Sequence, residues 1–302
     1  MYRETERRRA CQSRDKVFRD RGGGLYNGKP RDFVLADPRL NLWGGIRDDA
    51  IDYFTTGSIV WHKGSQGLPT GHLLSSQVAC INHLFFARQR KDVATAILEG
   101  IRPDIKEALI VDDGFVEFEF IGQDRYLMEK GWARGANCTS VDAAMLGMTD
   151  KGKTILFLIE WKYTEYYPVK NLKLEARSRI YDPFLIDPVN SPFIQPLDTD
   201  AMYYEPFYQM MRQTLLGSLC VKHRDHGCDD YMHVHVIPEG NLELRNNVTS
   251  PNLPGPDITQ AWTRILKNPD KYCCVTPEDL LIPCRGLKDL KTVFGYLERR
   301  YW

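Results

Sequence analysis

The sequence lacks the features that would assign it at once to several large classes of protein. Lys and Arg number 40 and Asp and Glu also number 40 among its 302 residues, so no excess charge of one sign attracts nucleic acid, and any such contact needs a local patch. No run approaches the roughly 20 consecutive apolar residues of a membrane-spanning helix. Met1 to Arg9 carries charges where a signal peptide has an apolar core. We therefore expect no membrane partner and a cytoplasmic location.

Several catalytic and structural motifs are also missing. The eight cysteines lack the density and spacing of a disulfide framework, so we expect them to remain thiols. The chain has no G-x-S-x-G motif and no G-x-x-x-x-G-K-[ST] motif, which leaves a serine hydrolase of that kind and a P-loop nucleotidase without support. With 43% hydrophobic residues, however, it has ample material for a buried core.

The first 32 residues differ in composition from the rest. They contain ten basic and five acidic residues, the run Gly22-Gly23-Gly24, and little apolar periodicity. This composition predicts a mobile basic arm over residues 1–32, either a solvated tail or an arm that contacts phosphate. We expect residues 33–302 to form a single domain, with a core at about 72–238 and a helical C-terminal extension over 239–302.

Apolar periodicity predicts the order of elements in that core. The core begins with a helical period, which is followed by a strand alternation and then by two apolar runs joined by a short turn. A long loop comes next, and a further helix and strand follow it. The expected elements are a helix at 72–100, strands at 115–121, 139–147 and 154–163, a loop at 165–200 with room for a short helix near 172–178, a helix at 202–219 and a strand at 231–237. This order, helix, three strands, helix, strand, predicts an α/β fold with a central mixed sheet flanked by helices.

Three residues stand where two of these strands become polar. Glu160 and Lys162 are two residues apart at the end of an apolar strand, so they share one face while Trp161 points to the other. Asp142 lies 18 residues before Glu160, on the preceding strand of the predicted hairpin. Two carboxylates that approach one another repel unless a cation lies between them, so this arrangement predicts a cation site.

Mg²⁺, or Mn²⁺ in its place, is the cation that this arrangement favours. Magnesium prefers oxygen ligands and is commonly held by one or two carboxylates, waters and substrate phosphate. We expect Asp142, Glu160 and the backbone carbonyl of Trp161 to be its ligands. Lys162 is then placed to orient or deprotonate the attacking water, and the reaction implied is hydrolysis of a phosphodiester.

The same residues resemble a known superfamily. Asp142 followed by Glu160-Trp161-Lys162, within this order of elements, is similar to the PD-(D/E)XK nucleases, or restriction-endonuclease-like proteins. The stretches 75–77, 136–142 and 160–165 resemble bacterial PD-(D/E)XK-like proteins of uncharacterised function, and the resemblance spans about residues 72 to 238. It implies metal ligation by Asp142 and Glu160, water activation by Lys162 and a nucleic acid partner, with DNA expected before RNA. The chain departs from the pattern at Val141, where proline is usual, and at Gln77, where many members have a glutamate.

Other polar residues are expected to support this site. Gln77 lies among apolar neighbours and needs a partner for its amide, either at the site or in helix packing. Glu119, like Glu117, either adds an acidic ligand or faces solvent. Gln209, Arg212 and Gln213 share one helix face, and we expect Arg212 either to contact phosphate or hold Glu160, or to be solvated.

Two other functions remain open from the sequence. One is a nucleic-acid-binding or scaffold protein that keeps the nuclease fold without turnover. The other is an interaction protein stabilised by zinc, because a cluster of thiol and imidazole side chains suits that ion although its spacing matches no common zinc pattern. That cluster comprises Cys220, His223, His226, Cys228, His233 and His235. A homodimer is a further possibility, since one such active site cuts one strand.

Overall fold

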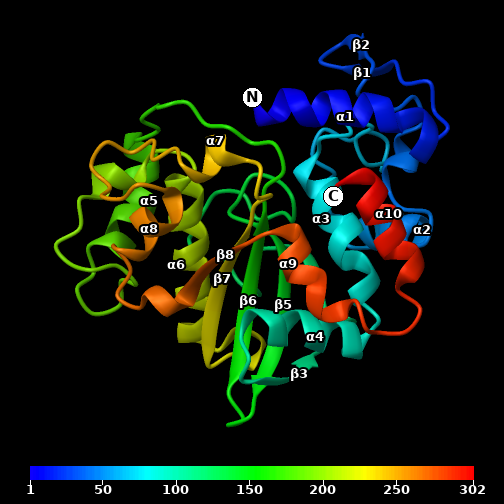
Figure 1. The fold of residues 1–302 in the computed structure, drawn as a ribbon. Coiled ribbons are helices and arrows are strands. Elements are labelled where there is room, and N and C mark those ends of the chain that lie inside the picture. The colour runs from blue at the N-terminus through cyan, green and yellow to red at the C-terminus, as the bar shows by residue number, and fades with distance from the viewer.

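A six-stranded mixed sheet is the centre of the computed structural model, which describes residues 1–302 (Figure 1). Its strand order is β3-β5-β6-β7-β8, and β4 also pairs with β5. Strands β3, β4 and β6 run antiparallel to β5, whereas β7 runs parallel to both β6 and β8. The strands are β3 (Ile105–Leu109), β4 (Glu117–Phe120), β5 (Val141–Thr149), β6 (Thr154–Trp161), β7 (Asp230–Val236) and β8 (Tyr272–Val275).

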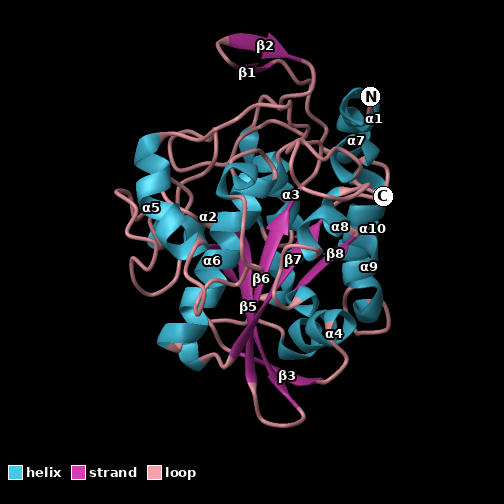
Figure 2. Ribbon diagram, turned by 90° about the vertical axis from the view of Figure 1, so that its left-hand side faces the viewer, coloured by secondary structure: helices cyan, strands magenta, loops and turns pink.

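Ten α-helices and one small hairpin complete the fold. The hairpin pairs β1 (Gly24–Tyr26) with β2 (Lys29–Arg31) and lies at the opposite end of the molecule from the β5–β6 turn (Figure 2). No helix has the length and apolar character needed to cross a membrane. The helices are α1 (Tyr2–Val17), α2 (Arg47–Thr56), α3 (Ser76–Leu84), α4 (Lys91–Ile101), α5 (Glu175–Leu185), α6 (Phe207–His223), α7 (Leu242–Arg245), α8 (Ile258–Thr263), α9 (Pro277–Leu281) and α10 (Lys291–Arg300).

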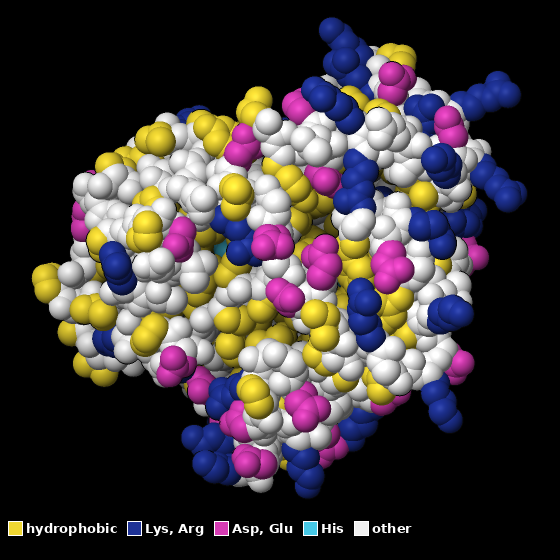
Figure 3. Space-filling model, in the orientation of Figure 1, with side chains coloured by type: hydrophobic (Ala, Val, Ile, Leu, Met, Phe, Trp, Pro, Cys, Tyr) yellow, Lys and Arg dark blue, Asp and Glu magenta, His cyan; other side chains and the backbone are white.

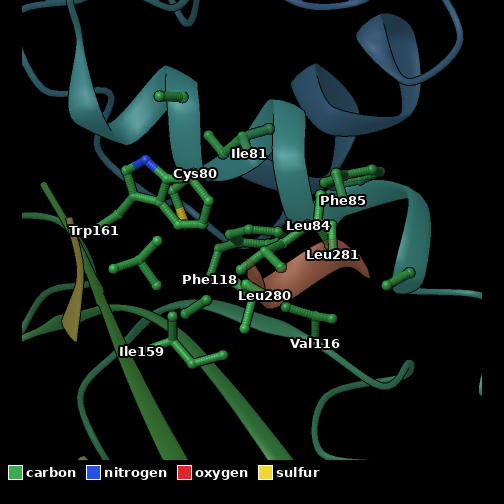
Figure 4. Close-up of a cluster of buried hydrophobic side chains, with 14 of the residues drawn as sticks. Cys80, Ile81, Leu84, Phe85, Val116, Phe118, Ile159, Trp161, Leu280 and Leu281 are labelled. Carbon is green, nitrogen blue, oxygen red and sulfur yellow. The ribbon is translucent and has the colours of Figure 1, made fainter. Parts of the chain in front are cut away.

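Helices cover both faces of the sheet, and strand β6 contributes to the core on each side. Ile155, Phe157, Ile159 and Trp161 point toward α3, α4 and α9, whereas the alternate residues of the strand point toward α6. Figure 4 shows Ile159 and Trp161 among the side chains of α3 and α9. This alternation follows from the period of two along a strand, and burial on both faces explains the apolar run of β6.

The predicted hairpin is confirmed, but the first long helix is wrong. Strands β5 and β6 pair antiparallel, and β6 lies inside the sheet. The stretch from His72 to Gly100 forms two helices, α3 and α4, separated by a short 3₁₀ turn at Phe85–Ala87. Beside this turn, the carbonyl of Arg88 accepts a hydrogen bond from Phe115 N–H, in the segment that leads to β4.

Several elements of the structure, β3 and β8 among them, were not expected from the sequence. Strands β3 and β8 have only five and four residues, which is too short for a clear alternation. The C-terminal extension is therefore not wholly helical, because it contains β8, which continues the sheet. Its helices α9 and α10 pack into the core beside α3. Within the loop at 165–200, the short helix considered near 172–178 is present as α5, which extends farther, to Leu185.

The basic N-terminal segment also differs from the expected mobile arm. Residues 2–17 form helix α1, which packs against α10. Glu6 accepts a hydrogen bond from Tyr163 Oη at 2.8 Å, and Arg9 donates to the carbonyl oxygen of Tyr301 at 2.8 Å. These partners lie 157 and 292 residues away in the chain, so local composition carried no sign of them.

Candidate active site

Glu160 and Lys162 form a buried ion pair where β6 ends. Lys162 Nζ lies 2.6 Å from Glu160 Oε1, and the two side chains are on the α6 side of the sheet, opposite Trp161. The residues are only 3% and 5% exposed. Burial lowers the pKa of Lys162, but Glu160 and the neighbouring Tyr167, Glu165 and Asp142 together outweigh burial and hold that pKa well above its usual range. Lys162 is therefore a persistent ammonium ion.

Asp142 joins this pair from the neighbouring strand. The pairing of β5 with β6 places Ala143 opposite Ile159, and the next step of that register places Asp142 opposite Glu160. One Asp142 oxygen, Oδ2, accepts a hydrogen bond from Trp161 N–H at 2.7 Å. Burial raises the pKa of Asp142 well above its usual range, and the negative charge of Glu160 raises it further. The two carboxylates therefore repel one another, as we predicted from their positions on the two strands of the hairpin.

Glu119 is a third carboxylate near this pair, on β4. It is buried, and it accepts hydrogen bonds from Gln77 Nε2 at 2.6 Å and from Ser140 Oγ at 3.1 Å. Burial and the negative charge of Glu160 raise the pKa of Glu119, whereas its two hydrogen bonds lower it. The resulting pKa is about 7. The reading in which Glu119 faces solvent is thus wrong, and the Gln77 amide has its partner at the site.

A local backbone feature explains why alternation did not reveal the place of Glu119. Its φ angle is 52°, in the left-handed region, so the strand turns locally and the simple alternation of side chains fails. Glu117 remains on a different side of β4, where it is near Arg134 and His226 at 3.6 and 3.9 Å.

Helix α6 supplies two amides that hold the ion pair. Gln209 donates to Glu160 Oε1 at 2.8 Å and accepts from Lys162 Nζ at 2.5 Å. Gln213 donates to Glu160 Oε2 and to the carbonyl oxygen of Ser140, the latter at 3.0 Å. The polar face of this helix is thus turned toward the sheet. Both oxygens of Glu160 are occupied, which fixes the orientation of its carboxylate.

Arg212 does not hold Glu160, although it lies on the same helix. Its guanidinium carbon is 4.7 Å from the centre of the Tyr208 ring, and its NH1 donates to Thr139 Oγ1 at 3.4 Å. The Arg212 Nε is buried and has no partner. A side chain packed on an aromatic ring in this way is also not an ordinary solvated residue.

The thiol and imidazole side chains expected as a zinc cluster do not converge. No group of three or more His, Cys, Asp or Glu side chains in residues 1–302 is arranged to hold a metal ion. His233 and His235 are buried in β7, where their Nδ1 atoms lie 3.2 Å from Thr214 and Tyr272 oxygens. Structural zinc needs about four protein ligands, so this chain offers no such site.

A divalent ion such as Mg²⁺ makes a smaller demand on the protein. It is commonly held by one or two carboxylates, with waters and phosphate as its other ligands. Asp142 and Glu160 supply two such carboxylates, and a cation between them would offset the burial and the repulsion that raise the pKa of Asp142. Both Glu160 oxygens already accept hydrogen bonds, so an ion must displace at least one donor. Glu160 and Lys162 are almost fully buried, and substrate reaches them only if neighbouring side chains move.

A mixed sheet flanked by helices, with acidic residues and a lysine gathered at its centre, is compatible with a restriction-endonuclease-like core. Comparison with protein families agrees with this class, since the family described as restriction endonuclease associating with ARP matches residues 4–302. The chain belongs to this family. Neither a curated protein nor a solved structure matches the chain.

Proposed function

We propose that the protein is a metal-dependent nuclease that hydrolyses phosphodiester bonds, with DNA as its substrate. The observation that carries this proposal is the convergence of Asp142, Glu160 and Lys162 in a chain whose family name is that of an endonuclease. In this reading Asp142, Glu160 and the carbonyl oxygen of Trp161 hold Mg²⁺ or Mn²⁺. The ion supplies charge neutralisation at the phosphate and a more acidic water.

The chain's own residues perform the remaining tasks in this proposal. Lys162 is a persistent ammonium ion in the resting site, which favours orienting the attacking water and stabilising negative charge over removing a proton. Gln209 and Gln213 hold Glu160 and Lys162 in register. Because one site cuts one strand, cleavage of both strands needs two copies of the site, which a homodimer would supply.

A cleavage assay with matched variants tests the proposal. Labelled duplex and single-stranded DNA and RNA are incubated with the protein and Mg²⁺ or Mn²⁺. Asp142→Asn and Lys162→Met are expected to reduce the cleavage rate at least about 100-fold, as loss of a group that stabilises transition-state charge does. Asp150→Asn and Lys151→Met change the same residue types in the exposed β5–β6 turn and should cleave like wild type.

The second candidate function is a nucleic-acid-binding protein without turnover. What favours it is the occupation of both Glu160 oxygens by amide donors and the burial of Lys162, which leave little room for a phosphate. A protein that binds oligonucleotides in this assay but cuts none of them with either ion would establish this reading. Cleavage that persists unchanged in both site variants would instead place the active site elsewhere.

A further inference from the structure

A pocket of about 210 Å³ lies beside the carboxylate and lysine cluster. One wall is the segment that follows β6, including Thr164, which is two residues after Lys162. A second wall is the start of helix α3, next to Gln77, whose amide reaches Glu119. The other walls come from α1, the β1–β2 hairpin and the segment before α3, at the end of the molecule where that hairpin lies (Figure 2).

The charged groups in this pocket are mainly cationic. Arg3 and Lys63 line it, and neither makes an ion pair within the chain. Lys63 is placed by Tyr26, since its Nζ donates to Tyr26 Oη at 2.9 Å. One carboxylate, that of Glu165, also lines the pocket, but it accepts a hydrogen bond from Tyr163 N–H at 2.5 Å. The surface around the pocket is basic as well, because Figure 3 shows Lys and Arg gathered over α1 and the hairpin.

A buried histidine adds an unused donor to the wall. His72 is 7% exposed, and its Nδ1 accepts a hydrogen bond from Leu74 N–H at 3.2 Å, so Nε2 carries the proton. The one hydrogen bond of the ring to the chain is at Nδ1, and the ring lines the pocket, so its Nε2–H is free to donate to a ligand. Burial, together with the charges of Arg3 and Lys63, lowers the pKa of His72 to about 4, so the ring is a neutral donor at pH 7.

Three hydroxyl side chains add further donors to the wall. Ser75, Ser76 and Thr164 present hydroxyl groups, and Ser76 begins α3, whose first-turn N–H groups carry a partial positive charge. Guanidinium, ammonium, imidazole N–H and hydroxyl groups together suit an acceptor with several oxygens. A phosphate group has that chemistry, whereas a metal ion or an apolar ligand does not.

We propose that this pocket binds a phosphate of the nucleic acid strand that flanks the bond to be cut. The inference rests on the proposed function for the identity of its ligand, since a phosphate contact beside an active site positions the strand on the protein. The phosphate is either one in the backbone or the one at a 5′ end. Arg3 and Lys63 supply positive charge, and the Nε2–H of His72 donates a hydrogen bond that orients the phosphate.

Equilibrium binding tests this proposal without turnover. The Asp142→Ala protein is titrated, in the presence of a chelator, with a fluorescent oligonucleotide over a range of salt concentrations. Adding Arg3→Ala or Lys63→Ala is expected to weaken binding about tenfold, the effect of losing one charge-assisted hydrogen bond, and to lower the slope of log K against log salt by about one. Adding His72→Phe should weaken binding with no change in that slope.

Matched residues of the same basic surface serve as controls. Arg8→Ala lies on α1 as Arg3 does, and Lys29→Ala lies on the hairpin, yet neither residue lines the pocket. If the pocket variants bind no more weakly than these controls, the proposal is wrong. Oligonucleotides with and without a 5′-phosphate separate the two sources, because a pocket for the terminal group loses affinity when that phosphate is removed.

Failure of this inference is distinguishable from failure of the proposed function. If wild-type protein never cleaves but the pocket variants selectively weaken oligonucleotide binding, catalysis is refuted and the phosphate pocket stands. If wild-type protein cleaves but these variants bind like the controls, only the pocket is refuted. Circular dichroism of each variant identifies one that has lost its fold, and the remaining pocket variants then decide the question.

Discussion

The side-chain amide of Gln213 donates hydrogen bonds both to the Glu160 carboxylate and to the carbonyl oxygen of Ser140. It therefore connects helix α6 to two neighbouring strands at the point where the candidate site lies. Replacing Gln213 with Leu is expected to lower the free energy of unfolding by about 1–3 kcal/mol, because a buried carboxylate loses a donor. Urea denaturation measures this loss.

A double-mutant cycle separates this hydrogen bond from general packing. With Glu160→Gln as the second change, the two losses should differ from additivity by at least about 0.5 kcal/mol, as they do for residues in contact. Strict additivity would mean that Gln213 stabilises α6 through its other contacts alone.

Repulsion between carboxylates predicts that Asp142→Asn stabilises the protein when no divalent ion is present. The asparagine oxygen can still accept the Trp161 N–H, whereas the charge that opposes Glu160 is gone. We expect a gain of about 0.5–2 kcal/mol in the free energy of unfolding, the range common for single stabilising substitutions.

The gain should depend on pH in a defined direction. The folded pKa of Asp142 lies above its unfolded value, so wild-type protein loses stability as pH rises through that interval. Urea denaturation in chelator should therefore show a larger gain at pH 8 than at pH 4. The exposed Asp150→Asn variant should show almost no gain in stability at either pH. For Asp142→Asn, a change in stability that is the same at pH 4 and pH 8 would contradict the repulsion.

Gln77→Glu tests whether the surroundings of Glu119 can be converted into a cation site. The substitution places a new carboxylate where an amide now donates to Glu119 at 2.6 Å. The variant should be less stable than wild type in chelator, since like charges at this distance repel. Mn²⁺ should raise its melting temperature more than that of wild type, because a bound ion stabilises the folded state.

Gln77→Met is the matched control for that measurement. It removes the same hydrogen bond without adding charge, so Mn²⁺ should shift its melting temperature no more than that of wild type. Equal Mn²⁺ shifts for the glutamate and methionine variants would show that no ion enters beside Glu119.

Acid sensitivity follows from a buried histidine on the other face of the sheet. Burial lowers the pKa of His83 to about 3, whereas the unfolded chain has a histidine pKa of about 6.5. Between these values the unfolded state binds the proton and the folded state does not, so stability falls as pH falls. At about 1.4 kcal/mol per pH unit, this one group removes about 3 kcal/mol between pH 6.5 and pH 4.5.

His83→Phe keeps an aromatic ring beside Trp161 and cannot take up a proton. Its free energy of unfolding should therefore fall less than that of wild type over the same pH interval, by up to about 3 kcal/mol. Parallel curves for the two proteins would show that His83 is not the group that responds to acid.

The sequence was sufficient for the parts of the site that regular geometry determines. Asp142, Glu160 and Lys162 meet because strand residues alternate between faces and a short turn brings β5 against β6. Their roles as ligands and as a catalytic amine stay predictions. Glu119 escaped the same reasoning, because one left-handed residue within β4 breaks the alternation.

Long-range contacts account for the other differences from expectation. Helix α1 has few apolar residues of its own and is held by hydrogen bonds to residues near Tyr163 and Tyr301. The short strand β8 is a strand because β7 lies beside it, not because its four residues show a pattern. Neither partner is visible in a local window of sequence.

The contact between α1 and α10 has a consequence for how this chain matures on the ribosome. Arg9 leaves the ribosome almost 300 residues before Tyr301, whose carbonyl oxygen accepts its hydrogen bond. At roughly 5–20 residues per second, the first helix waits at least about 15 seconds for its docking surface. The contact between α1 and α10 therefore forms only after all six strands of the sheet have been synthesised.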